Sequence, residues 1–198
     1  TKEGYMVMKE PLTTARKFQF ADVDWSKTKA WGEGGYYSRI FMNVEGREPQ
    51  GIVRAEDYER VRDDLPRRLA SIPDDRGNAM DTKVHKPEDV YDEVNGVAPD
   101  LIVHFGDLSW RWVGTVGGDD GVYTFENDTG PDDANHAQQG LLVMAGPGVP
   151  VERRDDMHLL DVAPTVLDLL GLPAPATMRG SSLISDRARH ATMEMIRS

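Results

Sequence analysis

The chain has 198 residues, of which 39% are hydrophobic and 29% are charged, a composition typical of a soluble globular protein with one sizeable core. With 34 acidic and 23 basic residues its net charge is −11, which disfavours general binding to nucleic-acid phosphates. No run of about 18 apolar residues occurs, so no membrane span is expected. The absence of Cys excludes disulfides and thiolate metal sites, fits a reducing compartment, and favours a cytoplasmic location.

The chain begins without an initiator Met, a signal peptide or a transit pattern. Gly4, followed by Tyr-Met-Val-Met, is typical of a helix end that leads into a strand, here residues 5–8. We therefore expect the chain to start inside a larger fold. Residues 1–29 are predicted to be the end of an upstream core and a connecting loop.

Residues 30–95 are predicted to form an α+β insertion with antiparallel, partly exposed strands. Residues 37–44 alternate in polarity, which indicates a half-buried strand with Ser38, Ile40, Met42 and Val44 on one face. Residues 55–72 place apolar side chains three to four apart, as in an amphipathic helix that Pro66 should kink or split. A strand at residues 81–85 and a helical turn at residues 87–90 are expected to follow.

Residues 96–198 are predicted to be the C-terminal segment of an α/β core. The apolar runs at residues 101–105 and 140–145 resemble strands covered on both faces, as in a parallel sheet. Residues 161–170 predict a helix capped by Asp161 and ended by Gly171. Alternation of buried strands and helices indicates an α/β layered fold, with the antiparallel insertion beside it.

Four of the five histidines lack a pattern that points to chemistry. His104 lies in an apolar strand and is expected to be a hydrogen-bonded core residue. His190 is expected to be solvated, and neither His85 nor His158 has a partner nearby in sequence.

The fifth, His136, ends a polar loop at residues 127–136 that offers acidic and amide oxygens. It is therefore a candidate metal ligand. The alternative is that the acids solvate a long turn and His136 caps it.

Several segments resemble the C-terminal part of the alkaline phosphatase superfamily, and most closely its type I phosphodiesterase/nucleotide pyrophosphatase family. They are NHAQQGLL at residues 135–142, GPGV at 146–149 and LDVAPTVLDLLGLP at 160–173. Further matches are DWSKTKA at 24–30, NVEGREPQG at 43–51, PDLIV at 99–103 and GDL at 106–108. The resemblance rests on this combination and order and covers nearly the whole chain.

The resemblance implies a phosphohydrolase with two divalent metals, usually zinc, that acts on a phosphoester or nucleotide-type small molecule. It makes His136 one metal ligand, because it matches the His of the family's His-x-x-x-Gly motif. The family's nucleophile and its other ligand motifs lie upstream of this segment, and no Asp-His pair occurs in the chain. We therefore expect the missing N-terminal part as a partner. The chain alone is expected to bind no metal tightly and to be inactive.

Within the insertion, Arg47 is a candidate for contacting a substrate phosphate, and the alternative is a turn-stabilising pair between Arg47 and Glu48. A sulfatase-like or phosphoglycerate mutase-like branch of the same superfamily is the alternative enzyme. The alternative from another class is a non-catalytic binding module that keeps the fold without the site.

Overall fold

The computed structural model describes residues 5–117, 122–125, 134–146, 149 and 151–184. The chain divides into two compact units, residues 1–139 and residues 140–198.

The first unit is built on a four-stranded antiparallel sheet with the order β2-β3-β5-β4. The strands are β2 (Ala30–Gly34), β3 (Ser38–Met42), β4 (Lys83–His85) and β5 (Leu101–His104). A two-stranded ribbon pairs β1 (Arg16–Lys17) with β6 (Thr115–Val116). Short 3-10 turns occur at Phe20–Asp22 and Ala55–Asp57, and a four-residue helix, α2, lies at Pro87–Val90. A turn with residues in the left-handed region follows β5 at Phe105–Leu108.

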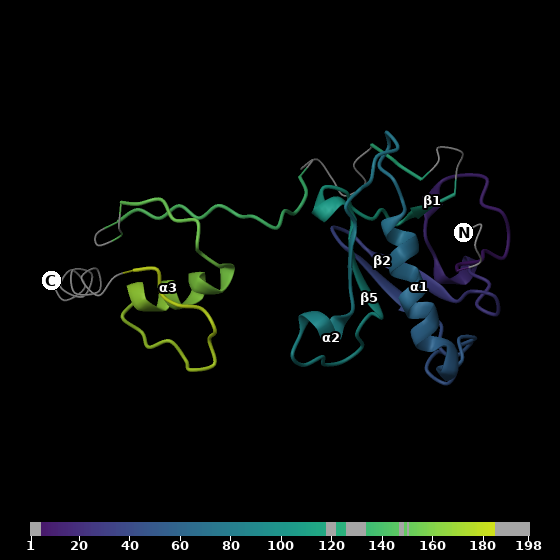
Figure 1. Cartoon of the computed structure of the whole chain (residues 1–198), viewed down its shortest axis with the longest axis horizontal. Coiled ribbons are helices and arrows are strands. Elements are labelled where there is room, and N and C mark those ends of the chain that lie inside the picture. Colours follow the sequence, from purple (N-terminus) through teal and green to yellow (C-terminus); the bar gives the residue numbers. More distant parts are fainter. Residues whose placement is uncertain (1–4, 118–121, 126–133, 147–148, 150, 185–198) are drawn as a thin grey trace. The chain divides into compact units, whose positions relative to one another are not determined.

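Helix α1 (Tyr58–Ala70) packs against one face of this sheet (Figure 1). Its buried apolar side chains, Val61 and Leu65, join the core below. Pro66 does not divide the helix, which runs unbroken across it. The buried core residues are Ala30, Ile40, Met42, Val53, Val61, Leu65, Met80, Leu101, Val103 and Phe105.

The predicted alternation of β3 is confirmed. Ser38, Ile40 and Met42 are buried against the core, whereas Arg39 between them is exposed. Successive side chains of a strand point to opposite faces, so this pattern fixes which face of the sheet meets α1. The strand at β4 and the helical turn at α2 also form where the sequence predicted them.

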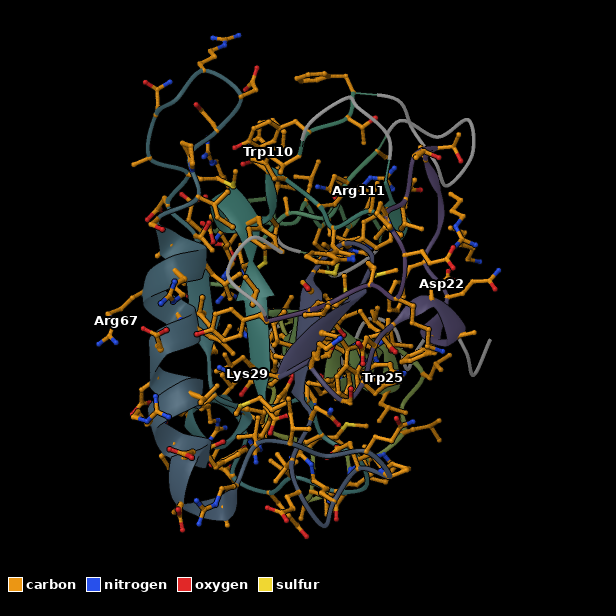
Figure 2. All side chains as sticks on the ribbon, turned by 90° about the vertical axis from the view of Figure 1, so that its right-hand side faces the viewer. Asp22, Trp25, Lys29, Arg67, Trp110 and Arg111 are labelled. Carbon is orange, nitrogen blue, oxygen red and sulfur yellow. The ribbon has the colours of Figure 1, made fainter. Side chains whose placement is uncertain are left out.

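The opposite face of the sheet carries an aromatic cluster. Trp31 of β2 stacks on Phe41 of β3, with ring centroids 5.4 Å apart, and Trp25 meets Trp31 edge-on at 5.0 Å. In Figure 2, Trp25 and Asp22 lie on the side of the strands away from α1, from which Arg67 projects outward. These rings cover part of the face of the sheet that α1 does not contact.

Two expectations about strands in the first unit are wrong. Strand β5 pairs antiparallel with both β3 and β4, not parallel, and only alternate residues of it, Leu101 and Val103, are fully buried. Ile102 is apolar and His104 is aromatic. The sequence of β5, which is covered by the core on one face, therefore resembles that of a strand buried on both faces. Residues 5–8 form only a single bridge between Met8 and Val23.

The second unit contains helix α3 (Val162–Leu169), preceded by a 3-10 turn at Leu159–Asp161. Gly171, with φ of +68°, ends α3: the N–H groups of Gly171 and Leu172 bond back to carbonyls in its last turn, as predicted for a C-terminal glycine. Asp161 makes no side-chain cap on α3. It forms a reciprocal capping box with His158 around the 3-10 turn.

The strand predicted at residues 140–145 is wrong. This segment has no regular structure, and the side chains of Leu141 and Val143 are 91% and 79% exposed. A run of apolar residues forms a buried strand only if neighbouring strands accept its backbone hydrogen bonds, and none does so among the described residues.

The mixed α/β class is confirmed: the described residues form two antiparallel sheets and three α-helices. The layering of an alkaline phosphatase core and the boundaries at residues 29 and 95 stay predictions. Strand β5, placed by sequence in the C-terminal segment, completes the same sheet as β2, β3 and β4. No helix in the described part of the chain is long and apolar enough to cross a membrane.

Candidate functional site

His136 lies in the first unit on an exposed loop, residues 134–139. Its ring packs edge-on against Tyr36, with centroids 4.0 Å apart, and its backbone N–H donates to the side-chain oxygen of Asn135 at 2.9 Å. The imidazole is thus exposed, as a ligand must be before a metal and further ligands cover it. The contact with Tyr36 limits its orientation.

Asn135 anchors this loop to the end of β5. Its side-chain amide donates a 2.7 Å hydrogen bond to the carbonyl of Leu108. That carbonyl belongs to a turn in which Gly106, Asp107 and Leu108 have φ of 55°, 53° and 73°. The left-handed region is unfavourable for Asp and especially for Leu, so this turn is strained. The strained turn therefore presents the acceptor that holds the His136 loop.

His136 has no ligand set around it in the described part of the chain. No group of three or more His, Cys, Asp or Glu side chains gathers there among the residues that the structure describes. The acidic neighbours that made this loop a candidate, Asp128, Asp132 and Asp133, lie outside those residues. The metal role of His136 is a prediction that these residues leave untested.

Arg47 is held by protein acceptors on all sides of its guanidinium. Nη1 and Nη2 donate to the two carboxylate oxygens of Asp100 at 2.9 and 2.7 Å, and Nη2 also donates to the carbonyl of Met42 at 2.6 Å. Nε donates to Glu48 at 2.8 Å, so the turn-stabilising pair weighed from the sequence is present. The side chain remains 43% exposed, and its contact with a substrate phosphate stays a prediction.

Asp100 is the buried centre of this network, with only 3% of its surface exposed. Burial alone would raise its pKa. Hydrogen bonds from Arg47, the hydroxyl of Tyr58 at 2.5 Å and the N–H of Met42 at 2.6 Å outweigh burial and lower the pKa below its usual value. Burial and the same hydrogen bond raise the pKa of Tyr58 to about 12. The carboxylate is therefore ionised and fully partnered, the arrangement of a structural ion pair rather than a free acid or base.

Asn43 ties together two of the segments on which the resemblance rests. It is 1% exposed, and its side-chain amide donates to the carbonyls of Trp25, Thr28 and Gln50, each at 2.9 Å. Segment 24–30 is thereby bound to segment 43–51, which Arg47 binds in turn to Asp100. These contacts give both segments a structural role in the first unit.

A pair of histidines at the edge of the sheet was missed by sequence reasoning. The rings of His85 on β4 and His104 on β5 lie 5.3 Å apart between centroids. His104 is half-buried, and its Nδ1 lies 3.4 Å from the side-chain nitrogen of Gln138. Burial and the nearby His85 lower the pKa of His104. His104 is hydrogen-bonded, as expected, but it points away from the core; only the strand register could have revealed its partner.

Comparison with known proteins finds short similarity to one enzyme. A segment is 51% identical over 39 residues to 2,3-bisphosphoglycerate-independent phosphoglycerate mutase of Microcystis aeruginosa, covering 20% of this chain and 7% of that enzyme. The enzyme of the same name from a Cyanothece species is 56% identical over 39 residues, again 20% and 7%. That of Synechococcus elongatus is 47% identical over 45 residues, covering 23% and 8%.

The chain thus spans less than a tenth of the length of these relatives. No protein-family model matches the sequence, and no solved structure matches it. The similarity links the chain to a phosphoryl-transfer enzyme of the alkaline phosphatase superfamily. This similarity is to the phosphoglycerate mutase-like branch, which the sequence analysis gave as the alternative enzyme. Nothing in the comparisons supports the phosphodiesterase family specifically.

Proposed function

We propose that this chain is part of a metal-dependent phosphoryl-transfer enzyme of the alkaline phosphatase superfamily. The observation that carries the proposal is the 47–56% identity to phosphoglycerate mutases over 39–45 residues. In this proposal the chain contributes part of the fold and one metal ligand, His136. The rest of the site comes from the portion of the protein upstream of this segment.

The setting of His136 supports this role. The residue is exposed, its ring is oriented by Tyr36, and its loop is anchored through Asn135. A neutral imidazole is a ligand that zinc prefers, but a tight site needs three or four protein ligands. One imidazole fits such a site only in part. Two divalent ions, when bound, would stabilise charge on the transferred phosphoryl group.

The substrate class is a small phosphoester, and two branches of the superfamily differ in what they do with it. A mutase moves the phosphoryl group within one substrate, and the comparisons favour this branch. A phosphodiesterase or nucleotide pyrophosphatase hydrolyses it, and segments 24–30, 43–51, 99–103 and 106–108 favour that branch. Since those segments have structural roles in the first unit, the mutase branch is the stronger of the two. A sulfatase-like enzyme is the remaining enzymatic alternative.

The test uses the full-length protein that carries this chain, assayed with phosphoglycerate and with a nitrophenyl phosphodiester after loading with zinc. Turnover of phosphoglycerate supports the mutase branch, and release of nitrophenol supports the phosphodiesterase branch. The 198-residue chain alone should hydrolyse neither above background, because in this proposal the nucleophile and most ligands lie upstream. Absence of both activities in the full-length protein would favour the non-catalytic module.

His136→Ala in the same protein tests whether His136 is a metal ligand or only a residue of the loop. Bound zinc and turnover should both fall sharply, whereas the melting temperature should change little because the side chain is exposed. The control is His158→Asn, an exposed histidine of the second unit whose capping role Asn can fill. Full metal content and normal turnover in His136→Ala would show that the residue is not a ligand.

A further inference from the structure

Two imidazoles meet on one face of the sheet at its β4 edge. In the antiparallel pairing of β4 with β5, Lys83 lies opposite His104 and His85 lies opposite Ile102. Since side chains alternate with a period of two, all four lie on the same face, with His85 and His104 as diagonal neighbours. This is the face away from the core, and both histidines are half-buried on it.

The separation of the two rings is that of imidazoles sharing a metal ion. Zinc lies about 2.0–2.1 Å from a ligating imidazole nitrogen, and tetrahedral geometry then places two such ring centroids about 5 Å apart. The observed centroid distance is 5.3 Å, with 63° between the ring planes. The rings are therefore not stacked, and no large backbone movement is needed to bring one nitrogen of each to a common ion.

The side chain of Gln138 is placed to orient the imidazole of His104. Its side-chain amide lies 3.4 Å from Nδ1 of His104. The oxygen and nitrogen of an amide can exchange places by a flip, so Nδ1–H can donate to the amide oxygen. That tautomer leaves the lone pair of Nε2 free for a metal, and such a hydrogen bond to the second ring nitrogen is the usual support for a ligating His.

The charges around the pair are compatible with a cation. Lys83, which lies opposite His104, pairs with Asp107 at 3.0 Å. Asp107 favours positive charge at His104, and Lys83 opposes it. Within the described residues no third His, Cys, Asp or Glu joins the two imidazoles. The remaining positions around an ion would be filled by water.

We propose that His85 and His104 together bind one divalent transition-metal ion, zinc being the probe of choice, with Gln138 as the residue that positions His104. Imidazole ligands suit zinc, and an ion bound here would tie edge strand β4 to β5. The proposal is independent of the function proposed above, because it uses neither His136 nor the upstream residues.

The test is a zinc titration of the 198-residue chain, followed by calorimetry near neutral pH, with circular dichroism to show that each variant is folded. The wild-type chain should bind zinc, and His85→Ala and His104→Ala should each lose one equivalent or bind it at least tenfold more weakly. Gln138→Ala should weaken the same equivalent by a smaller factor. His158→Asn is the matched control and should bind like wild type.

His85→Ala keeps the proposal falsifiable if His104→Ala fails to fold, because His85 lies on the edge strand β4, which pairs with a neighbour on one side only. His136→Ala, measured in parallel, distinguishes zinc bound by His85 and His104 from any zinc bound by His136. Absence of zinc binding by the wild-type chain would overturn the proposal. Unchanged binding in folded His85→Ala would overturn it as well.

Discussion

Arg47 and Asp100, which are 53 residues apart in the chain, form a two-armed ion pair, with Nη1–Oδ1 of 2.9 Å and Nη2–Oδ2 of 2.7 Å. Asp100 precedes β5, and Arg47 lies in the turn after β3. The pair therefore fixes the turn to the strand that neighbours β3 in the sheet. Parallel double hydrogen bonds of this kind are stronger and more directional than a single contact.

Asp100→Asn should destabilise the first unit by about 2 kcal/mol, because it breaks the two-armed pair at its buried carboxylate and leaves Arg47 with Glu48 as its charged partner. Urea denaturation at neutral pH measures the loss. The matched control is Asp57→Asn, which removes an exposed carboxylate paired with Arg60 on the same unit and should change stability little. Equal effects of the two substitutions would mean that the Asp100 network contributes no special stability.

The same carboxylate predicts a loss of stability in acid. Its pKa is lower in the folded state than in the unfolded chain, where it is about 3.9, so folding is favoured by its ionised form. Its contribution is complete above the unfolded pKa and is lost as the pH falls through the folded pKa. Denaturation of wild type and Asp100→Asn from pH 7 to pH 3 should show their difference shrinking below about pH 4. A constant difference across this range would contradict the assignment.

Arg47→Ala distinguishes the ion pair from substrate binding. The substitution leaves the buried Asp100 carboxylate with only Tyr58 and the Met42 N–H as partners, so the melting temperature should fall. If the full-length protein is the proposed phosphoryl-transfer enzyme, a structural role of Arg47 predicts an unchanged KM at temperatures where the variant is folded. A rise in KM for a phosphoester that exceeds the loss of stability would establish contact with substrate. Arg47→Lys, which cannot form the two-armed pair, is the companion variant.

Gly51→Ala should destabilise the first unit by about 3 kcal/mol, because the added Cβ would lie 1.9 Å from the carbonyl oxygen of Val44. Gly46→Ala in the same turn is the control. It meets no atom within 4 Å but has φ of +80°, so it should cost only about 1 kcal/mol. Thermal denaturation of the two variants separates close backbone approach from conformational preference. A smaller effect at Gly51 than at Gly46 would contradict the packing of this turn.

Asn135→Ala should loosen the His136 loop without unfolding the unit, because it removes only the exposed hydrogen bond to the carbonyl of Leu108. If His136 binds zinc in the full-length protein as proposed, the zinc affinity should fall roughly tenfold, as when a supporting hydrogen bond is removed from a metal ligand. Asn78→Ala, an exposed amide of another turn, is the control. If both variants bind zinc like wild type, the anchor does not position His136.

Periodicity in the sequence was sufficient to predict the elements whose burial is one-sided. The alternation of Ser38, Ile40 and Met42 specified β3, and apolar spacing specified α1 despite Pro66. Gly171 marked the end of α3 because a left-handed residue closes the last helical turn. These signals are local, because each depends on which face of a single helix or strand is apolar. The order of neighbouring residues determines that face.

The direction and partners of strands were decided only by the tertiary structure. The apolar run that forms β5 is compatible with parallel or antiparallel neighbours, and the similar run at residues 140–145 forms no strand. Backbone hydrogen bonds between strands depend on which segment lies alongside, and residue order does not state this. The pairing of Arg47 with Asp100 and the meeting of His85 with His104 are consequences of that register. Neither pair could be predicted from the sequence, because the residues of each pair are far apart in the chain and no periodic pattern connects them.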